Sequence, residues 1–471
     1  MWAEHSLPER TGKWPRLLRL RTHHDGARCP GYRSRRLSHR GDPVVRPQQE
    51  LHVWRDEQRV GTLWRGDDGR LMGFEYDDAW QATGQAISHS LPLSRKTWLP
   101  EDQRAHRWFG NLLPEEQARE ALIKRLGIPD DDFSLLAAIG GDCAGALTIL
   151  PPGQAPLSRD QSSGDYRALE LDRLGQWAAF RERYALMADD DPAKRPRLSL
   201  AGAQDKIPVL VWDGALYLPS GVAPSSHILK FAVEGREQVI LNELYLNTLA
   251  RLAGLACPPT AMGHASRHPY LIVERYDRRG IGTRHIERLH QEDLCQAMGL
   301  ARTQKYQAFG GPRFGQGVQR VREACKPSAA SIQHLLRWQL FNVLVGNSDG
   351  HAKNVSLLQD AQGRWQIAPA YDLVGTIVLG YNPELAFSVG EQFNSMQLLP
   401  RDWRAFAREC RFSYPFVKRQ IQDMAATLAE LADSSSLQQA LQQAGLGDNG
   451  WVRLQQQRQH IHKQCRRAER W

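Results

Sequence analysis

The sequence lacks the long apolar runs and cysteine patterns that would place it in a membrane or among disulfide-bonded proteins. Mean hydropathy is −0.52, and no run of 18 or more apolar residues occurs, which excludes a membrane-spanning helix. The seven cysteines are widely scattered and form no C-x-x-C pair, so neither a disulfide framework nor a zinc ribbon is expected. The opening residues contain no apolar segment of the signal-peptide type. We therefore expect a soluble, reduced, cytoplasmic protein.

Positive charge is concentrated at the two ends of the 471-residue chain. Residues 1–48 hold 11 Lys and Arg against 4 Asp and Glu, residues 451–471 hold 6 against 1, and the remaining 402 residues carry a net charge of −3. We expect the first segment to be a disordered basic extension. The alternative is a later natural start, at Val44 or Val45. The 41% hydrophobic content is enough for real cores, in two to four structural units at roughly 100–200 residues per domain.

Short strands give way to helices along the chain, which predicts an α+β protein. Alternating runs from Leu51, broken by Asp-Gly turns, predict a small antiparallel sheet, followed by a helix from Pro114 to Gly127 and a strand over 139–150. Strands around one helix, at 239–253, are expected next, and the chain beyond about residue 285 is mostly helical. The expected divisions are a basic extension at 1–48, a β-rich N-terminal subdomain at 49–150, a linker at 151–170, a β-rich lobe at 165–280, a helical lobe at 281–445 and a basic tail at 446–471. Such a two-lobed arrangement suits a nucleotide cleft between the lobes.

The segment NSDGHAKN, residues 347–354, is the sharpest chemical signal. Asp349 and Asn354 have the spacing of a kinase catalytic loop, in which the aspartate accepts a hydroxyl proton and the asparagine binds Mg²⁺. His351 or Lys353 would add positive charge or a hydrogen bond beside the transferring phosphoryl group. The alternative is a polar surface turn, because D-x-x-x-x-N is common by chance.

Asp372, in APAYDLVG, lies 18 residues beyond Asn354 and after a predicted strand. A kinase site has its second metal ligand in this position. An aspartate in a turn or helix cap is the alternative. The two motifs together favour phosphoryl transfer, because the chemistry requires both in this order.

Three further segments complete a possible nucleotide site. Lys230 ends the predicted strand HILK, where it would reach phosphates and pair with Glu243 of the next helix. Small residues between 201 and 206 would let backbone N–H groups approach phosphate, although neither a Walker motif nor G-x-G-x-x-G is present. The backbone of 274–276 would bind adenine. A surface lysine, an exposed glutamate and an ordinary core strand are the alternatives.

These motifs resemble, in order, those of the HipA family of serine/threonine kinases, the toxin halves of bacterial type II toxin–antitoxin modules. The resemblance covers about residues 51–430 and rests on SLAGAQDK, HILK, NELYLNTLARLAGL, LIVERYDR, RLHQEDLCQAMG, NVLVGNSDGHAKN and APAYDL. FGNLLPE and IGGDCAGAL resemble the family's small N-terminal domain. The resemblance implies a two-lobed protein-kinase-like fold with that β-rich subdomain attached. His290 departs from an expected proline, Gln307 from a common glutamate, and GGPRFGQG is a longer glycine segment than usual. None of these changes removes a catalytic group.

The resemblance implies a role for each matching residue. Asp349 would be the catalytic base, Asn354 and Asp372 the metal ligands, and Ser199 an autophosphorylated serine whose phosphate repels ATP. The residues implied for the ATP site are Ala201, Gly202, Ala203, Gln204, Asp205, Lys206, Lys230, Glu274, Arg275, Tyr276, His351, Ala352, Lys353, Asn354, Tyr371 and Asp372, with Glu243 as a structural ion-pair partner.

The implied function is that of an ATP- and Mg²⁺-dependent protein serine/threonine kinase. Family members phosphorylate aminoacyl-tRNA synthetases, which causes growth arrest or persistence, and HipB-like helix-turn-helix antitoxins neutralise them and bind operator DNA. This chain has no recognisable helix-turn-helix, so DNA contact would run through the antitoxin, with non-specific help from the basic ends. Two alternatives stay open: a small-molecule kinase, and an inactive co-repressor scaffold that binds nucleic acid. The intact residues Lys230, Asp349, Asn354 and Asp372 argue against the scaffold.

Overall fold

The computed structural model describes residues 49–156, 166–170, 174, 198–199, 206–232, 236–265 and 268–471, with only the backbone of residues 198–199. All of these residues belong to one unit, Arg46–Trp471. Three expectations fall outside the described residues: the basic extension at 1–48, most of the linker, and the phosphate-loop residues Ala201–Asp205. The side chain of Ser199 is also outside them.

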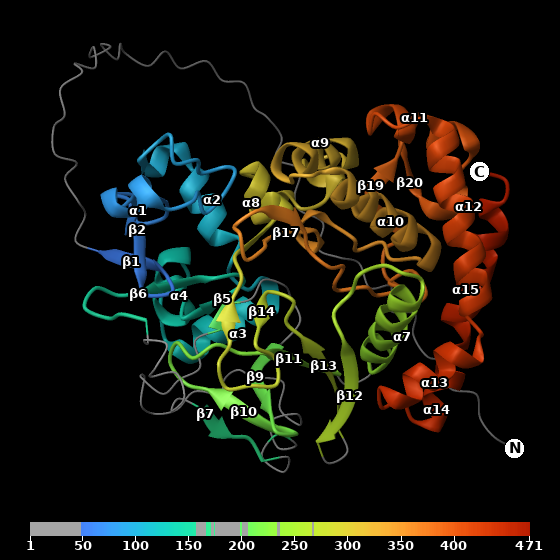
Figure 1. The fold of residues 1–471 in the computed structure, drawn as a ribbon, viewed down its shortest axis with the longest axis horizontal. Coiled ribbons are helices and arrows are strands. Elements are labelled where there is room, and N and C mark those ends of the chain that lie inside the picture. Colours follow the sequence, from blue (N-terminus) through green and yellow to red (C-terminus); the bar gives the residue numbers. More distant parts are fainter. Residues whose placement is uncertain are drawn as a thin grey trace, which may run out of the picture. The chain divides into compact units, whose positions relative to one another are not determined.

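The first part of the structure is an antiparallel sheet, as the alternating runs predict (Figure 1). Between its second and third strands, Asp68 Oδ1 accepts the N–H groups of Arg70 and Leu71 at 2.9 and 3.0 Å, and Gly69 has φ +67°, a value that favours glycine. In the order β4-β3-β2-β1-β6, the strands are β4 (Thr97–Trp98), β3 (Met72–Tyr76), β2 (Gln58–Arg65), β1 (Glu50–Arg55) and β6 (Leu147–Leu150).

Helices pack with this sheet around a core of their own. They are α1 (Asp78–Thr83), α2 (Arg104–Gly110), α3 (Glu116–Leu126) and α4 (Asp132–Ile139), with the short turn η1 (Pro100–Asp102). The expected helix before Gly127 is α3, which ends there in the left-handed conformation. The predicted strand over 139–150 is partly wrong. Ile139 ends α4, whose N-cap Asp131 accepts the Ser134 N–H, and only β5 (Asp142–Cys143) and β6 are extended.

A second antiparallel sheet carries the predicted strands IPVLVW, HILKF and YLIVERY as β9, β11 and β13, although β13 ends at Glu274, before Arg275 and Tyr276. Its order is β12 (Thr260–Ala265), β13 (His268–Glu274), β11 (His227–Phe231), β9 (Lys206–Trp212), β10 (Ala215–Pro219) and β7 (Tyr166–Ala168). The expected helix is α7 (Gln238–Leu252). It is buried on every side from Ile240 to Ala250 and shares the core of the helical lobe, which places Glu243 in the interior. The backbone of β8 (Leu198–Ser199) pairs in parallel with β5.

The chain beyond residue 285 is mainly helical, as expected. The helices are α8 (Leu294–Met298), α9 (Phe314–Ala324), α10 (Ala329–Val345), α11 (Pro400–Glu409), α12 (Tyr414–Leu431), α13 (Ser435–Gln443), α14 (Asp448–Arg453) and α15 (Gln455–Ala468). Short turns are η4 (Arg302–Gln304), η5 (Gln307–Phe309), η6 (Ala352–Asn354) and η7 (Ser395–Gln397). No helix among the described residues is long and apolar enough to cross a bilayer.

Small antiparallel strand pairs and a three-stranded sheet accompany these helices. The strands are β14 (Arg278–Arg279), β15 (Glu287–Arg288), β16 (Gln291–Asp293), β17 (Ser356–Gln359), β18 (Trp365–Ile367), β19 (Glu384–Val389) and β20 (Gln392–Asn394). β16, β17 and β18 form one sheet. The turn η6 leads directly into β17, so this sheet anchors the end of the segment that contains Asp349 and Asn354.

The segment 446–471 is not a separate basic tail, which corrects the expectation from its charge. Its helix α15 lies beside α12 (Figure 1), and Ile461, Cys465 and Trp471 are buried in the core of the helical lobe. Gln457 of α15 donates Nε2–H to the Val345 carbonyl at 2.7 Å. The charged residues occupy the outer face of an amphipathic helix, so net charge alone misassigned a core element. The overall α+β class, with a β-rich subdomain, a β-rich lobe and a helical lobe, is as expected.

Candidate active site

The end of α10 and the turn η6 bring Asp349 and Asn354 together. α10 ends at Gly346, whose φ of +76° reverses the chain, and Asp349 lies exposed in the following loop. The Asn354 Nδ2–H donates to the Asp349 carbonyl at 2.8 Å, and the Asp349 N–H donates to Asn347 Oδ1 at 3.0 Å. The five-residue spacing therefore closes a tight loop, as a kinase catalytic loop requires.

Tyr306 orients the Asp349 carboxylate, a contact that the sequence did not indicate. The Tyr306 hydroxyl donates to Asp349 Oδ1, and its ring meets the His351 ring edge-on at 5.0 Å between centroids. Burial and the nearby carboxylate raise the pKa of Tyr306, so the phenol stays protonated and remains a donor. Asp349 Oδ2 accepts no hydrogen bond from the described residues. One carboxylate oxygen is thus held and the other is available to a substrate hydroxyl.

Lys230 lies between two carboxylates, as its predicted pairing requires. Its ammonium donates to Glu243 Oε1 at 2.6 Å and to Asp372 Oδ1. Lys230 is 5% exposed and Glu243 1%. Burial favours the neutral amine, but the Asp372 and Glu243 charges outweigh it and raise the pKa of Lys230. The predicted lysine, helix glutamate and metal-ligand aspartate therefore form one cluster, in which Lys230 and Glu243 are buried and Asp372 is partly exposed.

Asp372 is held ionised and in a strained backbone conformation. Its φ is +57°, in the left-handed region that non-glycine residues rarely adopt. Burial opposes its ionisation, but Lys230 and Lys206 hold the pKa well below its usual range. Lys206 starts β9, and burial lowers its pKa, which the charge of Asp372 counteracts. Such strain concentrates at functional sites, where surrounding contacts enforce it.

Tyr371 joins the Asp372 segment to the catalytic loop and to the predicted hinge. Its hydroxyl donates to the Lys353 carbonyl at 2.7 Å, and its ring stacks on Tyr276 at 5.4 Å. The Glu274 N–H bonds to the Pro259 carbonyl at 3.0 Å. The Arg275 N–H likewise donates to the Ser226 carbonyl at 2.9 Å, and its guanidinium is buried against Asp142 and Asp277 at 3.1 and 2.9 Å. The N–H groups of Glu274 and Arg275 are therefore both occupied within the protein, and so is the Arg275 side chain.

Neither His351 nor Lys353 adds positive charge where the sequence interpretation put it. Burial lowers the pKa of His351 to about 4, so the imidazole is neutral near pH 7. The Lys353 ammonium is buried against the N-terminal subdomain, where it donates to the Asn111 carbonyl and Oδ1 at 2.8 and 2.9 Å. Ala352 donates its N–H to the Lys305 carbonyl at 3.1 Å. The Lys353 side chain and the Ala352 backbone therefore hold the loop, while the buried His351 Nδ1 has no hydrogen-bond partner among the described residues.

The residues present fit a magnesium ion. Asp372 offers an ionised carboxylate, and Asn354 keeps its side-chain oxygen available because its Nδ2 is bonded to Asp349. Carboxylate and amide oxygens are the hard ligands that Mg²⁺ prefers, usually together with water and substrate phosphates. Two protein ligands are therefore enough for a cation that a nucleotide also holds.

Comparisons with known proteins agree with this geometry. The model of the HipA N-terminal domain matches residues 51–150, and that of the HipA-like C-terminal domain matches residues 198–434. The chain is 35% identical over 396 residues to a Sinorhizobium fredii protein named "Putative kinase Y4mE", covering 82% of this chain and 93% of that one. It is 30% identical over 372 residues to the serine/threonine-protein kinase toxin HipA of Shewanella oneidensis, covering 76% and 82%.

A solved structure shows the same fold. It is the complex of Shewanella oneidensis HipA with HipB and operator DNA, and its matched chain aligns with a TM-score of 0.73 at 25% identity, covering 88% of this chain and 97% of that one. The kinase-like two-lobed architecture expected from the sequence is confirmed. With both domain models matched in order, and a relative at 35% identity over most of both chains, this chain belongs to the HipA family of kinase toxins.

Proposed function

We propose that the protein is an ATP- and Mg²⁺-dependent protein serine/threonine kinase. The observation that carries this proposal is the buried Lys230 ammonium between Glu243 and Asp372. A lysine paired with a helix glutamate beside a metal-binding aspartate is the phosphate-holding arrangement of protein kinases. The relatives named as kinases support the same activity.

Each residue has a defined part in the transfer. Asp349 accepts the proton of the substrate hydroxyl at Oδ2 while Tyr306 fixes Oδ1. The hydroxyl oxygen bonds to the γ-phosphorus, and the bond from that phosphorus to the bridging oxygen breaks, releasing ADP. Lys230 neutralises phosphate charge, and Asp372 and Asn354 would hold a bound Mg²⁺, which would supply stabilisation of the charge on the transferring group. The backbone of 274–276 and the segment 201–206 are proposed to bind the adenine and phosphates.

Label transfer tests this activity. The full chain is incubated with γ-labelled ATP and MgCl₂ beside Asp349→Asn. Asp360→Asn serves as the matched control, because Asp360 follows β17 in the same lobe and, among the described residues, bonds only within its own turn. We expect protein labelling by the parent and by Asp360→Asn, and none by Asp349→Asn. Absence of labelling by the parent, or equal labelling by Asp349→Asn, contradicts the proposal.

The proposal extends to regulation and partners. Autophosphorylation at Ser199 would place a dianion next to the phosphate segment and shut the kinase down. A HipB-like antitoxin, through which operator DNA is bound, fits the complex in which the Shewanella oneidensis relative was solved. Mass spectrometry after incubation with Mg-ATP should find phosphate on Ser199 in the parent. Parent protein labelled solely at other positions contradicts the autophosphorylation claim.

The proposed target is an aminoacyl-tRNA synthetase, whose phosphorylation would stop translation and arrest growth. A panel of purified synthetases, incubated with the kinase and labelled ATP, tests this directly. We expect one of them to gain label and lose tRNA charging. Labelling of other cellular proteins with no labelled synthetase contradicts this target class.

A further inference from the structure

One turn of the N-terminal subdomain reaches the catalytic loop. Residues 111–115 connect α2 to α3, and Leu112 and Leu113 are buried in the subdomain's own core, which fixes the turn. The ends of the turn, Asn111 and Glu115, are both buried and contact the helical lobe. The turn therefore holds the Asn111 amide and the Glu115 carboxylate against the loop that contains Asp349.

Asn111 and Glu115 hold the Lys353 side chain. The Lys353 ammonium donates to the Asn111 carbonyl and Oδ1 at 2.8 and 2.9 Å and lies 3.4 Å from both Glu115 Oε1 and Asp293 Oδ2. The Asn111 Nδ2 is occupied by the carbonyls of Arg107 and Leu300, at 2.8 and 2.9 Å. The Asn111 amide is thereby oriented with its oxygen toward Lys353. The Asn111 oxygens and the two carboxylates together bind the Lys353 ammonium group.

Glu115 also binds a second lysine, through its other oxygen. Glu115 Oε2 accepts from Lys305 at 2.7 Å. Lys305 directly precedes Tyr306, whose hydroxyl bonds the Asp349 carboxylate, and Lys353 directly precedes Asn354, whose amide bonds the Asp349 carbonyl. A single subdomain carboxylate thus anchors the neighbours of both donors that orient Asp349. The two lysines in turn lower the pKa of Glu115 against the effect of burial, so it stays ionised.

We propose that the N-terminal subdomain is part of the catalytic apparatus, with Asn111 and Glu115 as positioning residues for Asp349 and Asn354. The inference rests on the proposed kinase function and gives the subdomain a task within it. Loss of this anchor lets the loop drift from its reactive geometry, while Lys230 and Asp372 remain in place to bind nucleotide. The defect is therefore expected in the transfer rate and not in nucleotide affinity.

The test compares carboxylates on the same subdomain. Glu115→Ala removes the anchor, and Glu115→Gln removes its charge but keeps an acceptor. The matched control is Asp132→Asn. Asp132 is also buried, belongs to the same subdomain and pairs with Arg302 of the helical lobe at 2.7 Å and with Arg119 at 2.9 Å. Three quantities are measured for each variant: the rate of label transfer, the Kd for Mg-ATP, and hydrogen exchange of peptides covering residues 345–356.

We expect Glu115→Ala to slow transfer by about 10- to 100-fold, the cost of a misplaced reactive group, and Glu115→Gln to slow it less. The Kd for Mg-ATP should stay within about twofold of the parent, since binding and chemistry separate in this way when only positioning is lost. Exchange at 345–356 should rise in the Glu115 variants and not in Asp132→Asn.

Parent-like transfer by Glu115→Ala overturns the inference. An equal loss of transfer rate in Asp132→Asn overturns it too, because that result would indicate only weakened docking of the subdomain. Unchanged exchange at 345–356 overturns it as well. A parent that transfers no label contradicts the kinase function itself, and the exchange measurement still decides whether Glu115 holds the loop.

Discussion

Lys230 and Lys353 are two lysines with nearly the same burial, 5% and 6% exposed, and each lies near two carboxylates. Burial opposes the charge of both, and in both cases the carboxylates outweigh it and raise the pKa. Their surroundings differ. One Lys230 partner, Asp372, has a side chain that is 32% exposed, whereas both carboxylate partners of Lys353 are nearly enclosed.

The comparison separates Lys230, which is proposed to bind the nucleotide, from Lys353, whose ammonium is surrounded by protein groups. A buried ion pair brings little net stability, but removing one partner leaves the other buried without a counter-charge, so loss of either lysine is expected to destabilise the fold. At Lys230 the partly exposed Asp372 is the side on which the proposed nucleotide and cation would bind. At Lys353, Asn111 and two carboxylates fill the shell with protein groups. Sequence spacing made both lysines candidates for phosphate binding, and only their partners tell them apart.

The largest effect is expected from Asp372→Asn, which removes the exposed partner of Lys230. The substitution deletes the carboxylate proposed to hold the cation and leaves Lys230 with Glu243 alone. A metal ion supplies several kcal/mol of transition-state stabilisation, so label transfer should fall by about 10³-fold. Initial rates at saturating Mg-ATP measure this. Transfer within a few fold of the parent would show that Asp372 is another structural acid.

A smaller effect on transfer and a large effect on nucleotide affinity are expected from Lys230→Met. The substitution removes phosphate charge neutralisation and leaves Glu243 buried without its partner, which costs about 3–5 kcal/mol of folding free energy. Titration calorimetry with Mg-ATP should show weaker binding, and chemical denaturation should show the loss of stability. If Lys230→Met binds Mg-ATP like the parent, Lys230 serves only the fold and does not bind the nucleotide.

Lys353→Met should reduce transfer by about tenfold while it leaves Mg-ATP affinity unchanged, because positioning is lost and the nucleotide-binding groups remain. Lys96→Met is the control, since Lys96 pairs only with Glu75 and Asp78 among the described residues, at an exposed position. Steady-state kinetics and calorimetry on the same preparations measure both quantities. A selective loss of Mg-ATP affinity in Lys353→Met would reverse the assignment of the two lysines.

The smallest effect concerns His290, a buried base that has no carboxylate partner in the part of the chain that the structure describes. The His290 Nε2–H donates to the Ile87 carbonyl at 2.7 Å, and its ring packs against the rings of Trp108 and Trp365. Burial lowers the pKa of His290 to about 3. The unfolded chain binds this proton near pH 6.5 and the folded chain does not. The contribution of His290 to the free energy of unfolding is therefore fully present above pH 6.5 and is lost as the pH drops from 6.5 toward 3.

His290→Gln keeps a donor for Ile87 and removes the titration. Its free energy of unfolding should decline less steeply below pH 6.5, by at most about 1.4 kcal/mol per pH unit. Denaturation of both proteins between pH 7 and about 5 measures the slopes, a range above the main carboxylate titrations. Identical slopes would show that His290 is protonated in the folded protein. A buried cation would then exist without a carboxylate partner, unlike Lys230 and Lys353.

Local spacing accounts for the part of the site that the sequence predicted. Asp349 and Asn354 share one tight loop, and Lys230 and Glu243 lie on a strand and the helix that follows it, so short-range pattern is enough to pair them. The fold class follows in the same way from alternating and helical periods. Charge segregation was a poorer guide, because it assigned α15 to a tail although its apolar face is buried.

Long-range contacts account for what the sequence missed. Asn111 and Lys353 are 242 residues apart, and Tyr306 and Asp349 are 43 apart, so no local period links them. FGNLLPE was recognisable as a motif, but its side chains acquire a role only where the subdomain packs on the catalytic loop. Arg275 is a further example. The prediction for it concerned only the backbone, as part of an adenine hinge, and gave no sign that its side chain lies in a buried network with Asp142.

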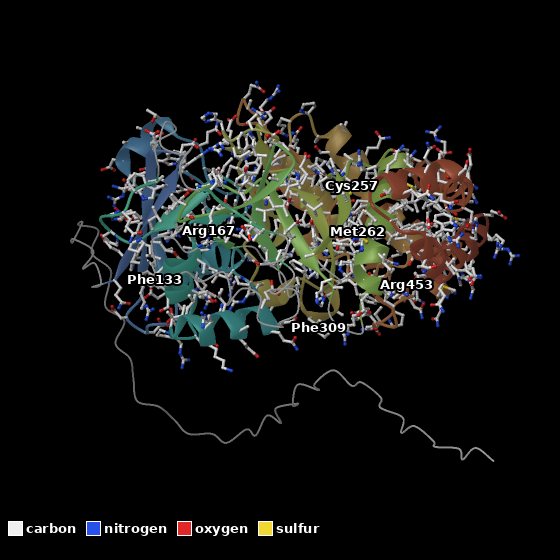
Figure 2. The ribbon with its side chains drawn as sticks, turned by 90° about the horizontal axis from the view of Figure 1, so that it is seen from below. Phe133, Arg167, Cys257, Met262, Phe309 and Arg453 are labelled. Atoms are coloured by element: carbon white, nitrogen blue, oxygen red, sulfur yellow. The ribbon has the colours of Figure 1, made fainter. Side chains whose placement is uncertain are left out.

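Phe309 is an exposed aromatic residue next to Tyr306. It ends η5, is 74% exposed at the surface (Figure 2), and its ring lies 6.1 Å from that of Tyr306. An exposed aromatic ring thus lies next to the tyrosine that holds Asp349, whereas Lys353 of the same loop is enclosed by Asn111 and Glu115 of the N-terminal subdomain.

The division of work between the two lysines is tested most directly by the affinity for Mg-ATP of Lys230→Met and Lys353→Met, measured by calorimetry beside the parent. The account predicts weakened binding by Lys230→Met and parent-like binding by Lys353→Met. Parent-like binding by Lys230→Met together with weakened binding by Lys353→Met would contradict it.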